Sequence, residues 1–350
     1  MAEHWVFESV AAMLAPEALS AILGRSVAAV REVPLGPQES AYSGSAITAI
    51  ETDAGRLFLK RVSRRWDYFM RVSDDRHGRE AAIWADGLLD RLPPEMAHVY
   101  LAVARDGDGW AILMRDVGPA LTAINGNITS AQHERIVTAL VATHAAYWDL
   151  APIDYGCDPW HHYHVVSPDA ALRDTGPRGP MHAIISDGWE KLVSLLDPGI
   201  ASQVLGLAND PTPLVTALAP LPQTLTHADA RPANIGIDGE TVVLIDWALA
   251  GRDVAGLDIV WYVAGAGSRC PTSREDALAL YERELAARLG PRLDQCDWAA
   301  IRDLSLLGGL LRHGWIAARV AYQSNPAQRD AGRADVAWWQ EAARAGLGRI

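Results

Sequence analysis

The chain has 350 residues, a formal net charge of −12 and three cysteines, and 49% of its residues are hydrophobic. This length is enough to bury roughly three-quarters of the unfolded surface in two lobes, whereas the acidic balance argues against general nucleic-acid binding, which needs a basic face. The sequence shows no basic-then-apolar leader and no apolar run that could span a membrane, and three widely spaced cysteines argue against a disulfide framework. We therefore expect a cytoplasmic protein with no nucleic-acid or membrane partner.

Short apolar segments broken by turn residues make up the first third of the chain. The strand candidates are residues 27–35, 46–52, 56–62 and 110–114. The turn Asp53-Ala54-Gly55 joins the second and third of these strands, and residues 77–91 have a helix-like pattern. Over residues 1–116 we therefore expect a small antiparallel sheet with a leading helical segment.

The rest of the chain, residues 117–350, has mainly helical periodicity. The helix candidates are residues 130–148, 273–290, 297–322 and 327–345. His144 falls on the apolar face of the first and is expected to be a core histidine, and Ser273 with an acid three residues later is an N-terminal signal for the second. Gly308-Gly309 marks a kink or a close contact in the third. Strands followed by helices predict an α+β class.

The stretch from His227 to Asp246, HADARPANIGIDGETVVLID, carries most of the functional information. Asp229 lies two residues after His227, Asn234 follows five residues later, and Asp246 closes an apolar run. Phosphoryl transfer from a nucleotide needs such a set, because one carboxylate must take or orient the acceptor's hydroxyl proton while an amide and a second carboxylate hold magnesium against the phosphates. The Asp-x-x-x-x-Asn spacing with a strand-borne Asp after it is that of a protein-kinase catalytic loop.

The same stretch predicts a local structure that would bring these groups together. Pro232 favours a turning loop after Asp229, and Asp238-Gly239 between two β-branched segments is a hairpin signal. Asn234 would enter the hairpin at the end where Asp246 leaves it, so two oxygen-bearing side chains would converge in a way that suits magnesium. The alternative is an ordinary surface hairpin flanked by polar loop residues.

This segment resembles the catalytic core of the aminoglycoside phosphotransferase and choline kinase-like family, in which His-Gly-Asp-x-x-x-x-Asn is followed by Ile-Asp-Trp. Here Ala228 takes the place of the Gly, Arg231 replaces a frequent His, and Ile245-Asp246-Trp247 matches the tripeptide. Asp258, in GLDIVWYVAG, matches a second Asp that braces the catalytic loop in that family. The likeness is specific over residues 225–263 and looser elsewhere. It implies a two-lobed protein-kinase-like fold with a small antiparallel-sheet N-lobe and a larger, mostly helical C-lobe.

The resemblance also implies roles for the residues of the motif. Asp229 would act as the base or orienting carboxylate, and His227 would order the loop through hydrogen bonds. Asn234 and Asp246 would hold Mg²⁺.

On the nucleotide side, the resemblance points to one ion pair in the N-lobe. Lys60, in LFLK, takes the position of the lysine that pairs with the α- and β-phosphates of ATP. Glu80 would be its ion-pair partner, although Glu51, Asp74 and Asp75 are nearby acids that could take that place.

Two further segments would bind the nucleotide through the backbone. In the turn-rich residues 36–45, Ser43-Gly44-Ser45 could cover the phosphates, and an ordinary hairpin turn explains the same residues. Met114, Asp116 and Val117 lie at the expected hinge and would face the adenine edge, so residue 116 is the predicted lobe boundary.

The function implied is that of an ATP- and Mg²⁺-dependent small-molecule kinase, with an aminoglycoside, an amino sugar, a choline-like amine alcohol or another metabolite hydroxyl as the acceptor. The net charge makes a cationic acceptor one option, because an acidic cleft concentrates cations. The alternative from another class is a catalytically silent nucleotide-binding pseudokinase with a regulatory or scaffold role. A zinc site at the HHYH run, His161 to His164, lacks a third ligand at usual spacing. The sequence does not identify the acceptor, does not distinguish ATP from GTP as the phosphoryl donor, and does not give the oligomeric state.

Overall fold

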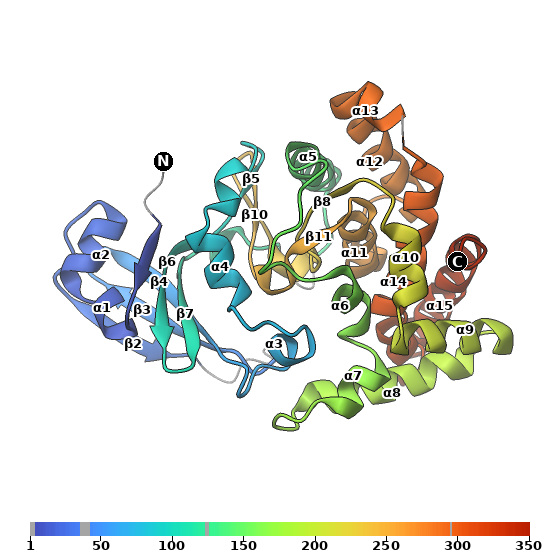
Figure 1. Cartoon of the computed structure of the whole chain (residues 1–350), viewed down its shortest axis with the longest axis horizontal. Helices are drawn as coiled ribbons and strands as arrows, with labels where there is room; N and C mark the ends of the chain where they lie inside the picture. Colours follow the sequence, from blue (N-terminus) through green and yellow to red (C-terminus); the bar gives the residue numbers. More distant parts are fainter. Residues whose placement is uncertain (1–3, 36–42, 123–125, 295) are drawn as a thin grey trace.

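The structure, a computed structural model, describes residues 4–35, 43–122, 126–294 and 296–350 of the chain. An N-terminal six-stranded sheet precedes a mainly helical C-terminal region, so the predicted α+β class is confirmed (Figure 1). In order across the sheet, the strands are β1 (Trp5–Phe7), β6 (Tyr100–Asp106), β7 (Gly109–Arg115), β4 (Gly55–Val62), β3 (Ala46–Thr52) and β2 (Val30–Pro34).

The sheet is antiparallel except at one edge. Strands β2, β3, β4, β7 and β6 pair antiparallel in that order, which confirms the antiparallel sheet, but β6 was not among the predicted strands and β1 joins β6 in parallel. A three-residue strand is too short to show a period of two, so the sequence pattern missed it. The strand predicted over 27–35 is also shorter, because the carboxylate of Asp53 accepts the backbone N–H groups of Ala28 and Ala29.

Alternating side chains divide the sheet between two cores. Ala102 and Leu113 face the helices α1 (Val10–Met13) and α2 (Pro16–Leu23), whereas Val103 and Ile112 face the C-terminal region. On this second side, β4 is followed by α3 (Tyr68–Val72), α4 (Arg79–Ala85) and the 3₁₀ turn η1 (Leu88–Arg91). In Figure 1, α4 lies between the sheet and the rest of the molecule.

The single helix predicted over residues 77–91 is wrong in one respect, because the segment is broken. Gly78 and Gly87 both have left-handed backbone conformations, with φ of +71° and +65°, and they bracket α4. Such a conformation ends helical propagation and is tolerated best by glycine. Helix α4 is therefore a short unit whose position is set by its contacts.

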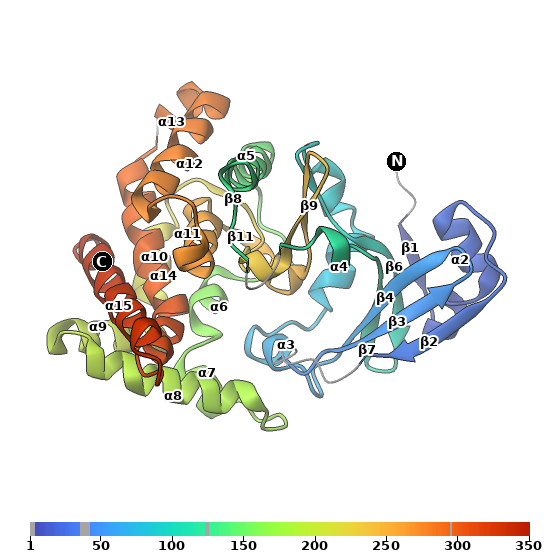
Figure 2. The same cartoon turned by 180° about the vertical axis from the view of Figure 1, so that it is seen from behind.

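The C-terminal region consists mainly of helices. They are α5 (Ser130–Ala146), α6 (Pro159–His164), α7 (Pro168–Arg173), α8 (Pro180–Leu195), α9 (Pro198–Asn209), α10 (Thr212–Leu218), α11 (Gly256–Ala266), α12 (Arg274–Leu289), α13 (Pro291–Asp294), α14 (Trp298–Val320) and α15 (Pro326–Leu347). The 3₁₀ turns here are η2 (Gly118–Ala120), η3 (Pro232–Asn234), η4 (Trp247–Leu249) and η5 (Gly267–Arg269). Both views show α8 and α15 packed beside α14 (Figure 2). Among the described residues, none of the helices combines the length and the apolar character that crossing a membrane requires.

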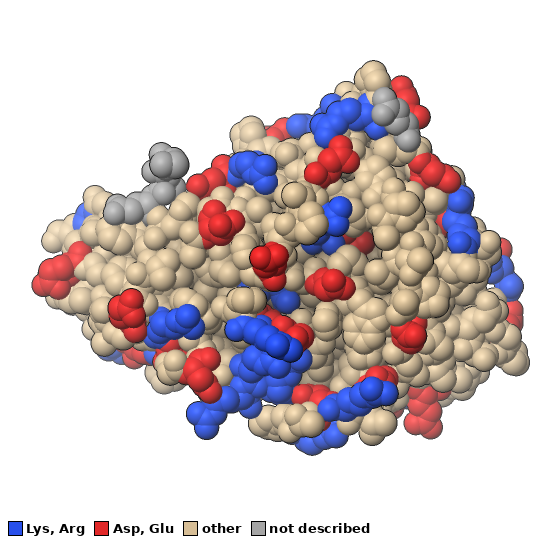
Figure 3. Space-filling model, in the orientation of Figure 1, with Lys and Arg blue, Asp and Glu red and all other residues tan. Residues whose placement is uncertain are grey.

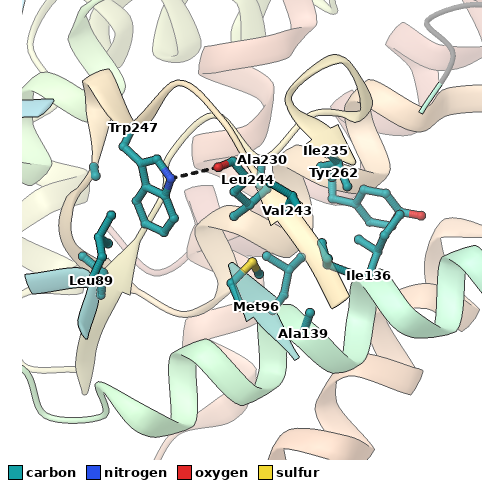
Figure 4. Packing of buried hydrophobic residues seen from close by; sticks show 14 of the residues in the cluster. Leu89, Met96, Ile136, Ala139, Ala230, Ile235, Val243, Leu244, Trp247 and Tyr262 are labelled. Carbon is teal, nitrogen blue, oxygen red and sulfur yellow. Dashed lines mark hydrogen bonds between the residues drawn. The ribbon is translucent and has the colours of Figure 1, made fainter. Parts of the chain in front are cut away.

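Two small sheets lie where the lobes meet. The first contains β5 (Met96–Ala97), β10 (Thr241–Leu244) and β9 (Ile235–Asp238), and the second pairs β8 (Gln223–Thr226) with β11 (Gly251–Val254). Figure 4 shows the core beneath the β9–β10 hairpin, where Met96, Ile136 and Val243 pack together. Trp247 closes this core, and its Nε1 donates to the carbonyl oxygen of Leu244 at 3.2 Å. The hairpin that carries the motif is therefore anchored to both lobes.

The glycine pair of α14 provides a close contact. The helix runs without interruption from Trp298 to Val320, and a methyl group on Gly309 would lie 2.5 Å from Val260 and 2.6 Å from Trp339. Helices α11 and α15 can therefore approach α14 only because this position has no side chain.

We expect Gly309→Ala to destabilise the fold by about 1–3 kcal/mol, because the added methyl group overpacks a helix contact. Gly206→Ala, in α9, is the matched control: a methyl group added there would meet no atom within 4 Å, so better helix propensity should stabilise the fold by about 0.5–1 kcal/mol. Urea unfolding measures both changes. Equal effects of the two substitutions would contradict the close-contact interpretation.

Candidate active site

Lys60 is the centre of an ion-pair cluster between the lobes. It lies on β4, one of the inner strands of the sheet, and its side chain is 7% exposed. Its Nζ donates to Glu80 Oε2 at 2.6 Å and to Asp246 Oδ1 at 2.7 Å. Burial opposes the charged form, but the two carboxylates outweigh it and raise the pKa of Lys60 above its usual range. Lys60 is thus a permanent cation shared by two acids.

Glu80 is tied to the turn that carries Asp246 by a buried hydroxyl. Tyr100, on β6, donates to Glu80 Oε1 at 2.6 Å and accepts the backbone N–H of Trp247 at 3.1 Å. Burial, and then the charge of Glu80, raise the pKa of Tyr100 well above its usual value, so this hydroxyl stays protonated. Contacts therefore link Lys60 on the sheet to Glu80 on α4, Glu80 to Tyr100, and Tyr100 to Trp247, the residue that follows Asp246.

The acids that compete with Glu80 in the sequence have other partners. Asp75 accepts the N–H groups of Gly78 and Arg79 and so caps α4. Asp74 pairs with two arginines on the surface, and Glu51 pairs with Arg31.

A buried carboxylate holds the loop before Asp229. The two oxygens of Asp258 accept the backbone N–H groups of His227 and Ala228, each at 2.7 Å. Burial raises the pKa of Asp258, but the hydrogen bond and charge of His144 and the N–H groups of the loop outweigh it and lower the pKa overall. Ala228 has φ of +60°, which explains why glycine suits this position. His144 is buried, as predicted.

His227 links this loop to the β10 strand. Its Nε2 donates to the carbonyl oxygen of Ile245 at 2.9 Å, and its Nδ1 accepts the N–H of Asp229 at 3.2 Å. The ring also packs edge-on against Trp247, with centroids 4.7 Å apart. His227 therefore orders the loop.

Asp229 is held in one orientation by neighbours on both of its oxygens. Trp261 Nε1 donates to Oδ1 at 2.7 Å, and Asn234 Nδ2 donates to Oδ2 at 2.7 Å. Arg231 Nε lies 3.3 Å from the same Oδ2. The carboxylate is still 19% exposed, so it is fixed in place without being sealed off.

Asn234 and Asp246 lie at the same end of the hairpin. The register pairs Ile235 with Leu244, and the N–H of Ile245 donates to the carbonyl oxygen of Asn234 at 3.0 Å. Asp246 has φ of +65°, a left-handed conformation that is unusual for a residue with a side chain. Burial raises its pKa, but the Lys60 charge outweighs this and holds the pKa below its usual range. Because the amide nitrogen of Asn234 donates to Asp229, its amide oxygen is the atom that could bind a cation.

The other predicted nucleotide residues lie around this cluster. Ser43 Oγ is 3.0 Å from Ser45 Oγ, and the Ser43 carbonyl accepts the N–H of Tyr68 at 2.7 Å. Gly44 has φ of +98°, and an added methyl group would lie 2.4 Å from the Trp66 carbonyl oxygen. The end of the predicted loop, Ser43 to Ser45, is therefore folded against the segment before α3. Residues 36–42 of the predicted loop lie outside the described residues.

The predicted hinge residues are engaged in the sheet and in a turn. Met114 pairs with Phe58, and the Asp116 carboxylate accepts the N–H of Gly118 at 2.8 Å. The Val117 carbonyl accepts two N–H groups of the following turn. Their contact with adenine, and the lobe boundary at residue 116, stay predictions.

A cavity of about 410 Å³ opens beside the cluster. From the motif and the N-lobe it is lined by Ser43, Lys60, Asp67, Phe69, Asp229, Arg231, Pro232, Ala233, Asp246, Ala248 and Leu249. Its remaining wall is Val166, Met181, Ile184, Trp261, Gly265, Arg269, Arg312, His313, Trp315, Ile316 and Arg319.

Sequence reasoning did not assign the contact of Trp261 with Asp229, and it missed Tyr100, Asp67 and Arg312. Trp261 had a signal, since it follows Asp258 by three residues and therefore shares a face of α11. Arg312 is a cation inside an apolar helical run, which was a second signal. Tyr100 and Asp67 had none, because their roles depend on contacts between distant segments.

Within the HHYH run, His162 has a structural role. His162 donates from Nδ1 to Asp253 at 2.8 Å and from Nε2 to the Leu249 carbonyl at 2.9 Å. Burial lowers its pKa, but Cys157 and Asp253 outweigh this and raise it to about 10. Among the described residues, no group of three or more His, Cys, Asp or Glu side chains could hold a metal ion, so the zinc alternative has no support there.

Asp67 gives the site a testable pH dependence. Its burial, reinforced by Asp246 and Glu80, raises the pKa of its carboxyl from 3.8 to about 6 despite the N–H of Met70 and the charge of Lys60. The unfolded chain therefore loses this proton first, and the folded state is penalised as the pH rises from about 4 to 6. The full penalty, above pH 6, is on the order of 3 kcal/mol.

We expect Asp67→Asn to stabilise the fold above pH 6 and to match the wild type below pH 4. The amide can still cap α3, so the comparison isolates the charge. Asp53→Asn is a control of opposite sign, because the N–H groups of Ala28 and Ala29 lower the pKa of Asp53; that variant should lose stability at neutral pH. Urea unfolding between pH 4 and 8 checks both, and a pH-independent effect of Asp67→Asn would contradict the assignment.

Comparison with solved structures places the fold. Amicoumacin kinase hAmiN, in complex with AMP-PNP, Ca²⁺ and Ami, is similar with a TM-score of 0.51 and 12% identity, over 89% of this chain and 90% of that chain. At that identity the likeness concerns the fold alone. Spectinomycin phosphotransferase APH(9)-Ia, in complex with ADP and spectinomycin, has a TM-score of 0.49 and 12% identity, over 96% of this chain and 98% of that chain. Choline kinase LicA from Streptococcus pneumoniae has a TM-score of 0.48 and 15% identity, over 95% and 97%.

Sequence comparison identifies the family. No curated protein matches the chain. The phosphotransferase enzyme family (APH) matches residues 46–296, a range that begins at β3 and contains Lys60, the catalytic-loop motif and Asp258. The chain therefore belongs to the phosphotransferase enzyme family.

Proposed function

We propose that the protein transfers the γ-phosphoryl group of ATP to a hydroxyl group of a small molecule, with Mg²⁺ as the metal. The observation that carries the proposal is the meeting of Lys60, Asp229 and Asp246 on the wall of one cavity, with Asp229 held by Trp261 and Asn234. Phosphoryl transfer depends mainly on positioning and on stabilisation of charge, and this arrangement supplies both.

The nucleotide would be held by the cationic cluster. Lys60 offers an ammonium group to the phosphates, and Glu80 keeps it in place on β4. The Ser43–Ser45 segment would cover the phosphates, and Met114, Asp116 and Val117 would line the adenine edge. AMP-PNP in the structure of the similar amicoumacin kinase hAmiN supports a nucleotide as the phosphoryl donor.

The donor set fits magnesium. Asp246 offers a carboxylate whose side chain is 40% exposed, and Asn234 offers an amide oxygen. Hard oxygen ligands of this kind, few in number, suit an ion that also binds substrate phosphates. When bound there, Mg²⁺ would neutralise the charge of the phosphates.

The acceptor's hydroxyl would be oriented by Asp229. The carboxylate reaches the cavity, and its two hydrogen-bonded oxygens allow it to accept a proton without turning away. His227 and Asp258 act indirectly, through the backbone of the loop that carries Asp229. Asp258 accepts the N–H groups of His227 and Ala228, and His227 accepts the N–H of Asp229.

Replacing Asp229 should separate chemistry from binding. We expect Asp229→Asn to lower kcat by about 10²–10⁴-fold, the usual contribution of a positioned base, and to leave Mg²⁺-ATP binding in place. The assay is ADP release with Mg²⁺ and ATP over a panel of hydroxyl acceptors, with Asp330→Asn on the exposed side of α15 as the control.

The result also separates the enzyme from a silent pseudokinase. Acceptor-dependent release that Asp229→Asn abolishes supports the kinase. Nucleotide binding with no acceptor-dependent release from any compound favours the regulatory alternative, and a chain that binds no Mg²⁺-ATP contradicts both.

Tyr100→Phe should weaken nucleotide binding from a distance. The variant leaves the buried N–H of Trp247 without its acceptor, which costs about 1–3 kcal/mol of stability, and it loosens Glu80 beside Lys60. We expect ATP affinity, measured by calorimetry, to fall together with stability. Tyr147→Phe is the control, since its buried hydroxyl donates to the Leu88 carbonyl outside the cluster; it should lose stability alone. Unchanged ATP affinity in Tyr100→Phe would argue against coupling of Tyr100 to the nucleotide site through Glu80.

A further inference from the structure

The charges on the cavity wall are unevenly distributed. The lining aspartates, Asp67, Asp229 and Asp246, belong to the phosphoryl end: Asp246 contacts Lys60, and Asp67 is close enough for both to shift its pKa. The cations beyond Lys60 are Arg231, Arg269, Arg312 and Arg319. On the described wall past Asp229, therefore, the charged side chains are arginines and no carboxylate is present.

Arg312 is a buried positive charge at the inner end of this wall. It is 1% exposed, stacks over the Trp261 ring at 4.5 Å, and donates from Nη2 to the Ala228 carbonyl at 2.5 Å. Its Nε and Nη1 have no hydrogen-bond partner among the described residues. A buried cation is costly unless anions compensate it, and burial lowers the pKa of Arg312, outweighing Asp229 and Asp258, which favour its charge. The site therefore favours additional negative charge.

Arg319 is the accessible cation at the outer end. It lies seven residues after Arg312 on α14, two turns along the same face and roughly 10 Å further from the catalytic loop. Its Nε pairs with Asp187 at 3.0 Å, and Lys191 pairs with the same carboxylate at 2.6 Å. Two cations thus share one anion, and the group as a whole remains positive.

The wall between these ends is apolar. It consists of Phe69, Val166, Met181, Ile184, Trp315 and Ile316. The neighbouring His313 is uncharged at neutral pH, because burial lowers its pKa to about 4. A volume of about 410 Å³ suits a compact organic molecule.

We propose that the acceptor is an alcohol with an apolar body and an oxyanion, a carboxylate or a phosphate, that pairs with Arg319 while its hydroxyl lies at Asp229. The inference rests on the proposed phosphotransfer at this cavity and narrows its substrate. A polyamine acceptor such as an aminoglycoside would place ammonium groups against arginines, and like charges there cost affinity.

The net charge of −12 does not oppose this assignment, because most of the carboxylates lie outside the cavity and the three that line its described wall belong to its phosphoryl end. On the face shown in Figure 3 the carboxylates are spread over the surface, whereas Lys and Arg gather around α3. The charge of the cavity wall, and not that of the whole chain, determines which acceptor binds.

A different use of the arginines would be to stabilise the transferred phosphoryl group. Arg231 and Arg312 are close enough to Asp229 for that role. Arg319 lies two helical turns away, so its replacement distinguishes the two uses.

The test compares acceptors that share one body and differ in charge. 10-Hydroxydecanoate, its phosphate counterpart 10-hydroxydecyl phosphate, the neutral 10-hydroxydecanamide and the cationic 10-aminodecanol are assayed for ADP release, beside an aminoglycoside panel. We expect one of the two oxyanions to be preferred, and the better one identifies the group. Preference for the amine or an aminoglycoside would overturn the inference.

Variants locate the effect. Arg319→Gln should raise the KM of the preferred anion on the order of tenfold, the size expected for a charged hydrogen bond, and leave the KM of the neutral amide and of ATP unchanged. Arg319→Glu should shift preference toward the amine. Lys191→Gln removes a cation from the same Asp187 outside the cavity and should change neither value. An equal loss of kcat with every acceptor would assign the arginines to the phosphoryl group instead.

Binding is measured separately from turnover. Trp261 and Trp315 line the cavity, so quenching of tryptophan fluorescence in the presence of Mg²⁺-ADP reports acceptor binding even if no phosphate is transferred. Tighter binding of an anion than of the amine, lost in Arg319→Gln, supports the inference without ADP release, and in that case only the proposed function fails. Tighter binding of the amine, or no binding of either anion, refutes it.

Discussion

One lysine shared by two carboxylates holds the two lobes together at the site. Lys60 comes from the sheet, Glu80 from α4 and Asp246 from the end of the hairpin, and the three meet with N–O distances of 2.6 and 2.7 Å. Lys60 and Glu80 are buried, and burying either charge alone would be costly, so each depends on the other. The arrangement positions the sheet, the helix and the metal-ligand candidate with one ammonium group.

A few side-chain contacts also hold two strained backbone positions at the site. Ala228 and Asp246 both adopt left-handed conformations, which cost on the order of 1–2 kcal/mol each for residues with a side chain. Asp258 holds the first through two N–H groups, and Lys60 holds the second through its carboxylate. The strain lies beside Asp229 and at a metal-ligand candidate, where a fixed geometry has most value.

Sequence predicted the fold class, the antiparallel strands and the β9–β10 hairpin, because turn residues and β-branched runs act locally. It failed where the outcome depended on a glycine conformation or on distant segments. The helix break at Gly87 and the parallel strand β1 are of this kind. The motif located Asp229 and Asp246 by spacing, but Trp261, which donates to Asp229, and Arg312, which donates to the Ala228 carbonyl, come from helices 32 and 84 residues further along the chain. The adenine edge at Met114 and Val117 is still a prediction.

The position of α4 has a consequence for regulation. In protein kinases, movement of the corresponding helix makes and breaks the lysine–glutamate pair and thereby switches activity. Here Arg79, next to Glu80, donates to the carbonyl oxygens of Ala248 and Tyr155 and to Ser73. An outward movement of the helix would therefore leave a buried guanidinium group without hydrogen-bond partners. The fold therefore favours a helix that stays docked, with the Lys60–Glu80 pair permanently assembled.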